Sequence, residues 1–405
     1  MKDSGVEWVG EIPADWEIVR FKYLHNGLNT GEAIDKEYWT ENETDFVFYT
    51  AGMNPIRTNY NDFPLWKFTD SSNLLLSRNG TPYVYFPYGN ACYTDHVIRA
   101  KIKVSENRNF IGYALQQSIL SVIVTSVSLA TWSASLWNEQ IIPYPPLSEQ
   151  NAIANFLDKK CAEIDKLTAD IKTQIEVLEN YKHSIITETV TKGLNPNVEM
   201  KDSGVEWVGE IPADWEIHPV YYYFGERKHK NTFGKESNLL SLSYGKIIRK
   251  DINTNDGLLP ESFNSYNIVE AEDIIIRPTD LQNDKRSLRT GLATERGIIT
   301  SAYIALMPIK SVNTAYYHYL LHAFDVMKVF YNMGSGVRQG LNFPEFSKLM
   351  LFEPSLEEQN VIVNFLDDKC AEIDKIIADK NEQLAALEEY KKSLIYEYVT
   401  GKKSV

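Results

Sequence analysis

Residues 149–191 read EQNAIANFLDKKCAEIDKLTADIKTQIEVLENYKHSIITETVT, and residues 358–400 read EQNVIVNFLDDKCAEIDKIIADKNEQLAALEEYKKSLIYEYVT. The two segments align without gaps and match at 27 of 43 positions. A repeat of this length within a chain of 405 residues indicates a duplicated architecture, in which each copy supplies an equivalent element.

Both copies have the pattern of a long amphipathic helix. Apolar residues recur every seven positions, which is the spacing of one helix face. They are Leu157, Ile164, Ile171, Leu178 and Ile185 in the first copy, and Leu366, Ile373, Leu387 and Leu394 in the second. Lys380 is the one break in this pattern. At a rise of about 1.5 Å per residue, each helix would be roughly 60 Å long.

The helices need caps at their first turns and a partner for their apolar faces. Ser148 is expected to cap the first helix, and Ser355 with Glu358 to form a capping box at the second. We expect Cys161, Leu167, Ile175 and Tyr181 to fill the face beside the seven-residue pattern. An approximate two-fold between the halves would pack the helices antiparallel as a coiled coil. The alternative is that each helix lies on its own domain.

A second, shorter repeat opens each half. MKDSGVEWVGEIPADWEI is identical at residues 1–18 and 200–217. Each copy carries one Lys and five acids, so it is unsuited to contact nucleic acid. Its tryptophans are expected to anchor on a domain core or in a pocket of a partner. They are Trp8, Trp16, Trp207 and Trp215.

The segments between the repeats predict α+β domains. Short strands are expected from β-branched and aromatic runs at 45–52, 83–89, 96–102, 272–278 and 297–309, and helices near 110–125 and 313–332. We expect a first domain at 1–148, a long helix at 149–193, a linker with the second domain at 194–357, and a second long helix with its tail at 358–405. The fold class is therefore α+β with an internal pseudo-two-fold repeat.

Composition and missing motifs narrow the function. There is no apolar run long enough for a membrane span and no export signal, so we expect a cytoplasmic protein. Cys92, Cys161 and Cys370 form no C-x-x-C pair, which argues against a disulfide framework or a structural zinc site. No phosphate-binding loop or nucleophile elbow is present. His318 and His322 lack the Glu of a zinc protease between them. We therefore expect no catalytic and no metal-binding residues.

Three polar stretches carry binding chemistry, because Arg and Lys read guanine edges whereas Asn and Gln read adenine. The candidate DNA contacts are Arg78, Asn79, Thr81 and Tyr83 in 77–93; Arg277, Thr279, Gln282, Lys285, Arg286 and Arg289 in 276–291; and Arg338, Gln339 and Asn342 in 334–342. Any one stretch taken alone is better explained as a solvated polar loop. Three of them on a duplicated scaffold favour DNA, although the net charge is −14. The first half has no counterpart of Arg338 and Gln339.

Together these features resemble the specificity subunit of type I restriction–modification systems. The resemblance is carried by WVGEIPADW at 8–16 and 207–215, by PPLSEQ at 145–150, and by PSLEEQ at 354–359. It covers essentially the whole chain. It implies two target recognition domains that each read one half of a bipartite double-stranded DNA site, with the long helices as spacer.

The resemblance also implies partners. Two methylation subunits would dock on the chain and methylate adenine at N6 with S-adenosylmethionine. Motor–nuclease subunits would supply ATP- and Mg-dependent cleavage. The chain itself would bind no cofactor. Two other functions stay open: a stand-alone DNA methyltransferase or nuclease with an unrecognised site, and a coiled-coil scaffold that binds only proteins. Such a scaffold would lack the log-linear salt dependence of DNA binding.

Overall fold

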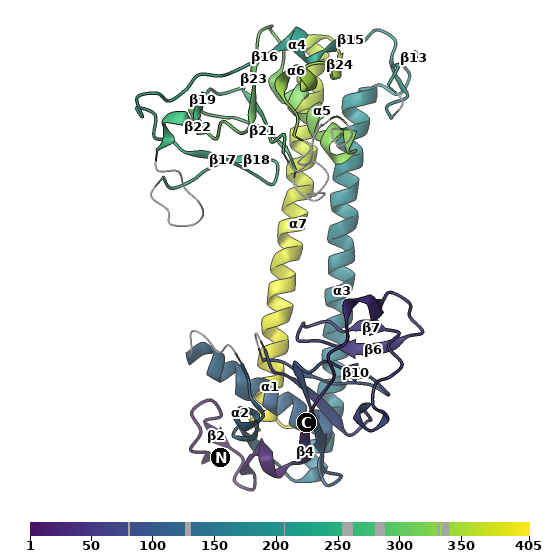
Figure 1. The fold of residues 1–405 in the computed structure, drawn as a ribbon, viewed down its shortest axis with the longest axis vertical. Helices are drawn as coiled ribbons and strands as arrows, with labels where there is room; N and C mark the ends of the chain where they lie inside the picture. Colours follow the sequence, from purple (N-terminus) through teal and green to yellow (C-terminus); the bar gives the residue numbers. More distant parts are fainter. Residues whose placement is uncertain are drawn as a thin grey trace. The chain divides into compact units, whose positions relative to one another are not determined.

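The structure is a computed structural model of the 405-residue chain (Figure 1). It describes residues 1–79, 82–125 (backbone only at 121–125), 131–205, 207–252, 262–279, 288–329, 333 and 340–405. The chain forms two compact units. Unit 1 comprises residues 1–172 and 381–405, and unit 2 comprises residues 173–380. Both long helices contribute to both units, so the units do not coincide with the four segments expected from the sequence.

Unit 1 begins with the first 18-residue repeat and ends in the first long helix. Its described elements are β1 (Lys2–Asp3), β2 (Glu11–Ile12), β3 (Glu17–Arg20), η1 (Phe21–Tyr23), β4 (His25–Thr30), η2 (Lys36–Tyr38), β5 (Trp39–Thr40), β6 (Phe46–Tyr49), β7 (Ile56–Thr58), η3 (Leu65–Lys67), β8 (Asn73–Ser77), β9 (Val84–Tyr85), β10 (Cys92–Tyr93), β11 (Val97–Ile102), α1 (Arg108–Thr125), α2 (Ala134–Asn138), β12 (Ile141–Tyr144) and the start of α3 (Leu147–Lys192).

Unit 2 repeats this order after the end of α3. Its described elements are β13 (Met200–Asp202), β14 (Glu210–Pro212), β15 (Glu216–Pro219), α4 (Val220–Tyr223), β16 (Phe224–Glu226), β17 (Leu240–Ser243), β18 (Lys246–Arg249), η4 (Phe263–Ser265), β19 (Asn267–Val269), β20 (Ile274–Ile276), β21 (Thr290–Leu292), β22 (Gly297–Ile299), β23 (Ile304–Pro308), α5 (Thr314–Val326), α6 (Phe343–Phe346), β24 (Met350–Glu353) and α7 (Leu356–Val399), which ends in unit 1.

The two units share a common frame. A four-stranded antiparallel sheet has the order β4-β11-β8-β9 in unit 1 and β16-β23-β20-β21 in unit 2. The strand that ends each 18-residue repeat pairs antiparallel with the strand before a long helix, β3 with β12 and β15 with β24. The additional strands differ. Unit 1 has the sheet β10-β6-β7-β5, whereas unit 2 has the hairpin β17–β18 and the pair β19–β22.

In unit 1 the long helices and the globular part share one core. Leu157 of α3, Leu394 of α7 and Phe110 of α1 are buried together with strand residues of the frame sheet. The helices run antiparallel here. The Phe156 ring packs against the Tyr398 ring at 4.5 Å between centroids, and Asp165, further along α3, pairs with Lys391, earlier in α7, at 2.5 Å. The expected antiparallel pairing is therefore confirmed within this unit.

Unit 2 has the same arrangement, but there the end of α3 and the start of α7 contribute to the core. Its core joins Val190 near the end of α3 to Leu366 near the start of α7. Lys182 of α3 pairs with Asp374 of α7 at 2.6 Å. Lys380, the break in the apolar pattern, donates to Gln174 Oε1 at 2.6 Å. The alternative in which each helix lies only on its own domain is wrong, because each helix also contacts the other.

The seven-residue pattern marks the seam of the helices. Five of its nine residues are buried, and these lie where a globular part also covers the helices: Leu157, Ile164, Leu366, Ile373 and Leu394. The other four, Ile171, Leu178, Ile185 and Leu387, are partly buried. The prediction that further apolar residues fill the face beside this pattern is only partly confirmed. Cys161 is buried, but Leu167 and Tyr181 are each about half exposed, because two helices alone cannot cover a stripe that wide.

The cap and strand predictions have mixed outcomes. Ser355 caps α7 and accepts from the Glu358 backbone N–H at 3.2 Å, which confirms the serine half of the expected capping box; the Glu358 carboxylate accepts from Trp215 at 3.1 Å. Ser148 does not cap α3, since that helix already begins at Leu147. All five expected strand regions contain strands, with 297–309 split into β22 and β23. The expected helix at 313–332 is wrong beyond Val326, where α5 ends; residues 330–332 lie outside the described residues.

The 18-residue repeat docks on the first turn of a long helix. Trp16 is buried and donates its indole Nε1–H to Glu149 Oε2 at 2.8 Å. In unit 2 Trp215 donates in the same way to Glu358 at 3.1 Å. The remaining tryptophans of the repeats, Trp8 and Trp207, pack partly buried on the cores. The expected anchoring of tryptophans on a domain core is therefore confirmed.

A glutamine follows this glutamate in each unit, Gln150 after Glu149 and Gln359 after Glu358. It ties the start of α1 or α5 to the first turn of the long helix. Gln150 Oε1 accepts from the Asn107 backbone N–H at 2.9 Å, and Gln150 Nε2 donates to the Pro145 carbonyl at 3.0 Å. Gln359 makes the equivalent bonds to Asn313 and Pro354, both at 2.9 Å. Both glutamines are buried, so these hydrogen bonds replace water. The Glu-Gln pair at the start of each long helix is thus a structural joint.

None of the helices in the described part of the chain combines the length and apolar character that a membrane span requires.

Candidate nucleic-acid interface

In unit 1 the candidate residues follow the central frame strand β8. Arg78 is exposed. Asn79 Nδ2 lies 2.8 Å from His96 Nδ1 at the start of β11, and Asn79 forms an isolated bridge with Thr131. Tyr83 is partly buried, with its ring 5.0 Å from the Tyr85 ring. The structure therefore brings an arginine, an amide and an exposed imidazole together at the end of one sheet. Thr81 lies outside the described residues.

In unit 2 the equivalent strand β20 leads into the second candidate stretch. Arg277 and Thr279 are partly buried, and the Arg277 backbone N–H donates to the Arg289 carbonyl at 2.8 Å. This pairing closes the base of the segment that connects β20 to β21. Gln282, Lys285 and Arg286 belong to that segment and lie outside the described residues.

Arg289 requires a correction. Its side chain is fully buried, and its guanidinium donates to the Thr279 carbonyl at 2.5 Å. Its backbone N–H donates to the buried carboxylate of Asp325. Burial raises the pKa of Asp325 to about 6, against the opposing effect of this hydrogen bond. Arg289 is therefore wrong as a direct DNA contact; it links Thr279 and Asp325 next to the start of β21.

Asn342 also has a structural role. It caps α6 through a complete capping box, in which Asn342 Oδ1 accepts from the Glu345 backbone N–H at 3.0 Å and the Glu345 carboxylate accepts from the Asn342 N–H at 3.3 Å. Ser133 caps α2 at the equivalent place in unit 1. The polar side chain at this position is thus explained by the helix end. Arg338 and Gln339 lie outside the described residues.

A backbone hydrogen bond marks an equivalent point in each unit, which we call the loop junction: in unit 2 it joins two candidate stretches, and in unit 1 it joins the single candidate stretch to Trp132. In unit 2 the Leu341 N–H donates to the Pro278 carbonyl at 2.9 Å, which joins the stretches 276–291 and 334–342. In unit 1 the Trp132 N–H donates to the Arg78 carbonyl at 2.6 Å. The frame is the same, but the side chains at the two junctions differ.

Sequence reasoning missed an exposed basic hairpin in unit 2. The tip of β17–β18 presents Tyr244, which is 85% exposed, followed by exposed Lys246 and Lys250. Tyr244 adopts a φ of 46°. The sequence SYGKIIRK at 243–250, with a Gly beside an aromatic residue and three basic residues after it, was the available signal. An aromatic ring next to Lys is suited to a nucleic-acid backbone.

A second missed feature is an aromatic hollow in unit 1. It has a volume of about 420 Å³ and is lined by Phe46, Trp66 and Lys101, among others. Trp66 is 64% exposed, with Lys67 Nζ 5.3 Å from its ring centre. Arg99 holds this loop by donating to the Trp66 and Phe68 carbonyls at 2.8 and 3.0 Å. The run FPLWKF at 63–68 carried the signal, since exposed aromatics next to Lys are unusual.

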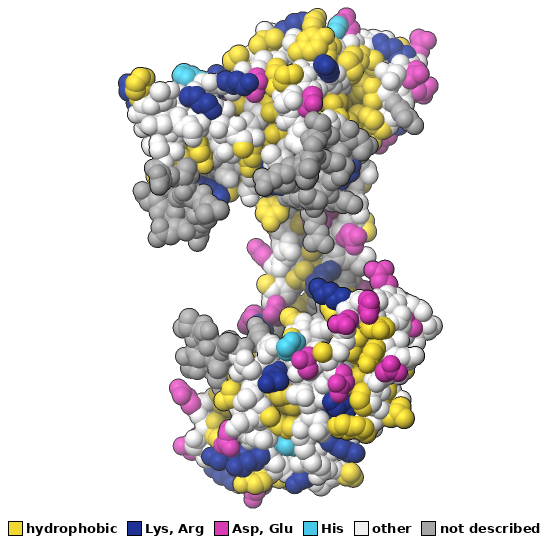
Figure 2. Space-filling model, in the orientation of Figure 1, with side chains coloured by type: hydrophobic (Ala, Val, Ile, Leu, Met, Phe, Trp, Pro, Cys, Tyr) yellow, Lys and Arg dark blue, Asp and Glu magenta, His cyan; other side chains and the backbone are white. Residues whose placement is uncertain are grey.

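Charges of both signs are mixed over the described surface. Figure 2 shows Lys and Arg side chains interspersed with Asp and Glu on both units, without a continuous basic face among the described residues in that view. Glu226 and Lys228, which resemble part of a nuclease motif, form an ion pair at 2.8 Å between a partly buried carboxylate and an exposed lysine. Arg227 between them pairs with the buried Asp273. This run therefore stabilises the fold locally.

A family model described as the type I restriction modification DNA specificity domain matches residues 13–177 and 230–386. The two matches fall on the two halves of the duplication and cover most of the chain. The chain belongs to this family. Membership confirms the predicted class, a specificity subunit of type I restriction–modification systems, and the predicted α+β fold with two long helices.

Individual relatives agree with this assignment. The putative type I restriction enzyme MjaX specificity subunit of Methanocaldococcus jannaschii is 28% identical over 267 residues, which are 64% of this chain and 59% of that protein. The MjaVIII specificity subunit of the same organism is 23% identical over 424 residues, with 96% of this chain and 93% of the relative covered. A solved structure from work on complex assembly and conformational transition of the type I R-M system has a TM-score of 0.67 at 13% identity, covering 97% of this chain and 100% of that chain; it shares the fold.

Proposed function

We propose that each unit reads one half of a bipartite double-stranded DNA target through its loop junction. One observation carries this proposal: the two junctions sit on an identical frame but present different polar groups. Unit 1 offers Arg78 and Asn79 beside His96, whereas unit 2 offers Arg277 and Thr279, which Arg289 contacts. Different side chains on equal frames are what an asymmetric target requires, because base edges are read by individual side chains.

The long helices are proposed to carry two equivalent docking surfaces for methylation subunits. Exposed apolar residues occur at matching positions of the two helices in each unit. Leu167 and Tyr390 are 51% and 55% exposed in unit 1, and Ile376 and Tyr181 are 38% and 53% exposed in unit 2. In unit 1 they border a hollow of about 440 Å³ with almost entirely apolar walls. Exposed apolar surface of this kind favours protein contacts.

On this proposal the chain acts in the cytoplasm and performs no catalysis. S-adenosylmethionine, ATP and Mg would be bound by partner subunits, including motor–nuclease subunits where the system has them. The stand-alone methyltransferase or nuclease is the competing function. It predicts methylation or cleavage of DNA by the purified chain without any partner.

Exchange of one domain tests the proposal. Residues 218–357 would be replaced by the equivalent segment of a relative, and methylated adenines would be sequenced in cells that carry either version. The expected result is a changed second half-site with the first half-site retained. Changes in both halves would contradict the assignment of one half-site to each unit. Adenine methylation by the purified chain alone would favour the competing function.

A further inference from the structure

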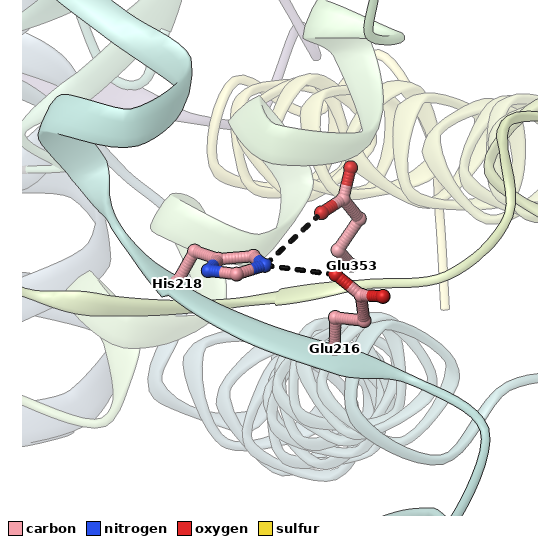
Figure 3. A group of neighbouring side chains, drawn as sticks. All are labelled: Glu216, His218 and Glu353. Atoms are coloured by element: carbon pink, nitrogen blue, oxygen red, sulfur yellow. Dashed lines mark hydrogen bonds and ion pairs between the residues drawn. The ribbon is translucent and has the colours of Figure 1, made fainter.

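Three metal-ligating side chains meet on the β15–β24 pair of unit 2. Glu216 and His218 lie on β15, and Glu353 lies on β24 (Figure 3). Their ligand atoms all lie within 4.8 Å of one another. Figure 3 shows the His218 ring directed at both carboxylates. Because Glu353 lies far from Glu216 and His218 in the sequence and the three follow no known ligand spacing, the sequence predicts no metal site here.

The distances suit a small divalent cation. His218 Nε2 lies 2.9 Å from Glu216 Oε2 and 3.9 Å from Glu353 Oε2. Ligand atoms around a tetrahedral zinc ion with bonds of about 2.0–2.1 Å lie about 3.3 Å apart. The two distances from His218 bracket that value, and the two carboxylates lie within 4.8 Å of each other, so side-chain rotations at the surface would complete three ligand positions.

The surroundings hold these ligands in place. The His218 ring stacks on Tyr222 at 4.0 Å between centroids with an interplanar angle of 22°, which fixes the direction of Nε2. Tyr223 donates its hydroxyl to Glu353 Oε2 at 2.8 Å. Hydrogen bonds of this kind orient ligating carboxylates in metal sites.

The charges also favour a cation. Glu216 and Glu353 are directly opposite each other in the strand register. Like charges at such a pair destabilise a sheet, and a divalent cation between them would cancel both. We propose that Glu216, His218 and Glu353 bind one Zn²⁺ or a similar first-row divalent ion, which joins the strand after the second 18-residue repeat to the strand before α7. One imidazole and two carboxylates match the ligand preferences of such ions, and a fourth position stays open to water.

Unit 1 provides an internal control. The register places Glu17 where unit 2 has Glu216, Val19 where it has His218, and Tyr144 where it has Glu353. Tyr144 instead donates its hydroxyl to Glu106 at 3.0 Å. The same strand pair therefore forms without the three ligands, so the fold does not require them.

The test uses the full chain, stripped of metal with a chelator and titrated calorimetrically with Zn²⁺. The wild type should take up one saturable equivalent. His218→Val, which installs the residue of unit 1, and the isosteric Glu353→Gln should each weaken binding at least tenfold, whereas Glu17→Gln should not. Co²⁺ should give absorption bands that both unit 2 variants lose. Equal affinity in the wild type and both variants, no saturable uptake, or a thiolate-to-cobalt band would overturn the proposal.

A gain of binding gives an independent readout. Val19→His combined with Tyr144→Glu transfers the missing ligands to unit 1, where Glu17 is already present. The doubly substituted chain should bind two equivalents of Zn²⁺ in place of one. A stoichiometry of one in a chain whose unit 1 remains folded by circular dichroism would contradict the proposed ligand set.

Discussion

Trp215 donates its indole Nε1–H to Glu358 across 3.1 Å, and Trp16 repeats this bond to Glu149 at 2.8 Å in the other unit. In both places an invariant segment of the duplicated repeat is tied to the first turn of a long helix. The identical repeats therefore have a structural task in each unit. Divergence is concentrated at the loop junctions, where the two units present different side chains.

This bond gives a prediction specific to each unit. Trp215→Phe keeps most of the ring but leaves the partly buried Glu358 without its donor, so unit 2 should lose about 1–2 kcal/mol of stability. Hydrogen exchange should show faster exchange in β15 and β24. Trp16→Phe is the matched control and should affect β3 and β12 instead. Equal changes in both units for either variant would contradict this role.

Substitutions of Arg78 and Arg289 should distinguish a residue that contacts DNA from one that supports the fold. Arg78→Ala removes an exposed side chain, so it should leave stability unchanged, cost about 1–3 kcal/mol of DNA binding and relax preference at one position of one half-site. Arg289→Ala removes buried hydrogen bonds and should destabilise unit 2 by about 1.5–3 kcal/mol. Gel shifts with the assembled complex and thermal unfolding measure the two effects. A stable Arg289→Ala chain with one relaxed position would reverse the assignment.

The sequence predicted the long helices well because a seven-residue pattern depends only on local spacing. The burial of Arg289 was not predictable, since its partner Asp325 lies 36 residues away and the surrounding stretch is polar. The role of Gln150 was hidden for the same reason: its partner Asn107 lies on another element. Side chains whose roles depend on distant partners leave no periodic signal, so the candidate site was predicted less well than the fold.

Gly401 lies after the end of α7 and should tolerate no side chain. Its φ is +68°, and a Cβ there would lie 2.4 Å from Pro13 Cδ. Gly5 has nearly the same φ, +69°, but open space around it. Gly5→Ala should therefore cost about 1–2 kcal/mol for the left-handed backbone alone, and Gly401→Ala clearly more. Thermal unfolding compares them, and equal losses would show that the Pro13 contact relaxes without cost.

The matching tyrosines on the long helices predict stoichiometry. If each unit docks one methylation subunit, Tyr390→Ser and Tyr181→Ser should each reduce the bound methylation subunits from two to one. The double variant should bind neither tightly. Native mass spectrometry of the purified complex measures this directly. Leu65→Ser is a suitable control, because Leu65 is 88% exposed but lies outside the helices. Retention of two subunits by the double variant would contradict the proposed surfaces.

The stability of unit 2 should depend on pH through α5. Burial lowers the pKa of His318 to about 4 and that of His322 to about 3. Below pH 6.5 the unfolded chain takes up protons at both residues while the folded chain does not, so stability falls as the pH falls. Asp325, with its pKa raised to about 6, acts in the opposite direction between pH 6 and 3.8. The net loss from pH 6.5 to 5 should be about 2 kcal/mol. His322→Gln should remove most of it in hydrogen-exchange measurements, with unit 1 as internal reference. An unchanged pH dependence in this variant would show that His322 binds protons equally in the folded and unfolded states.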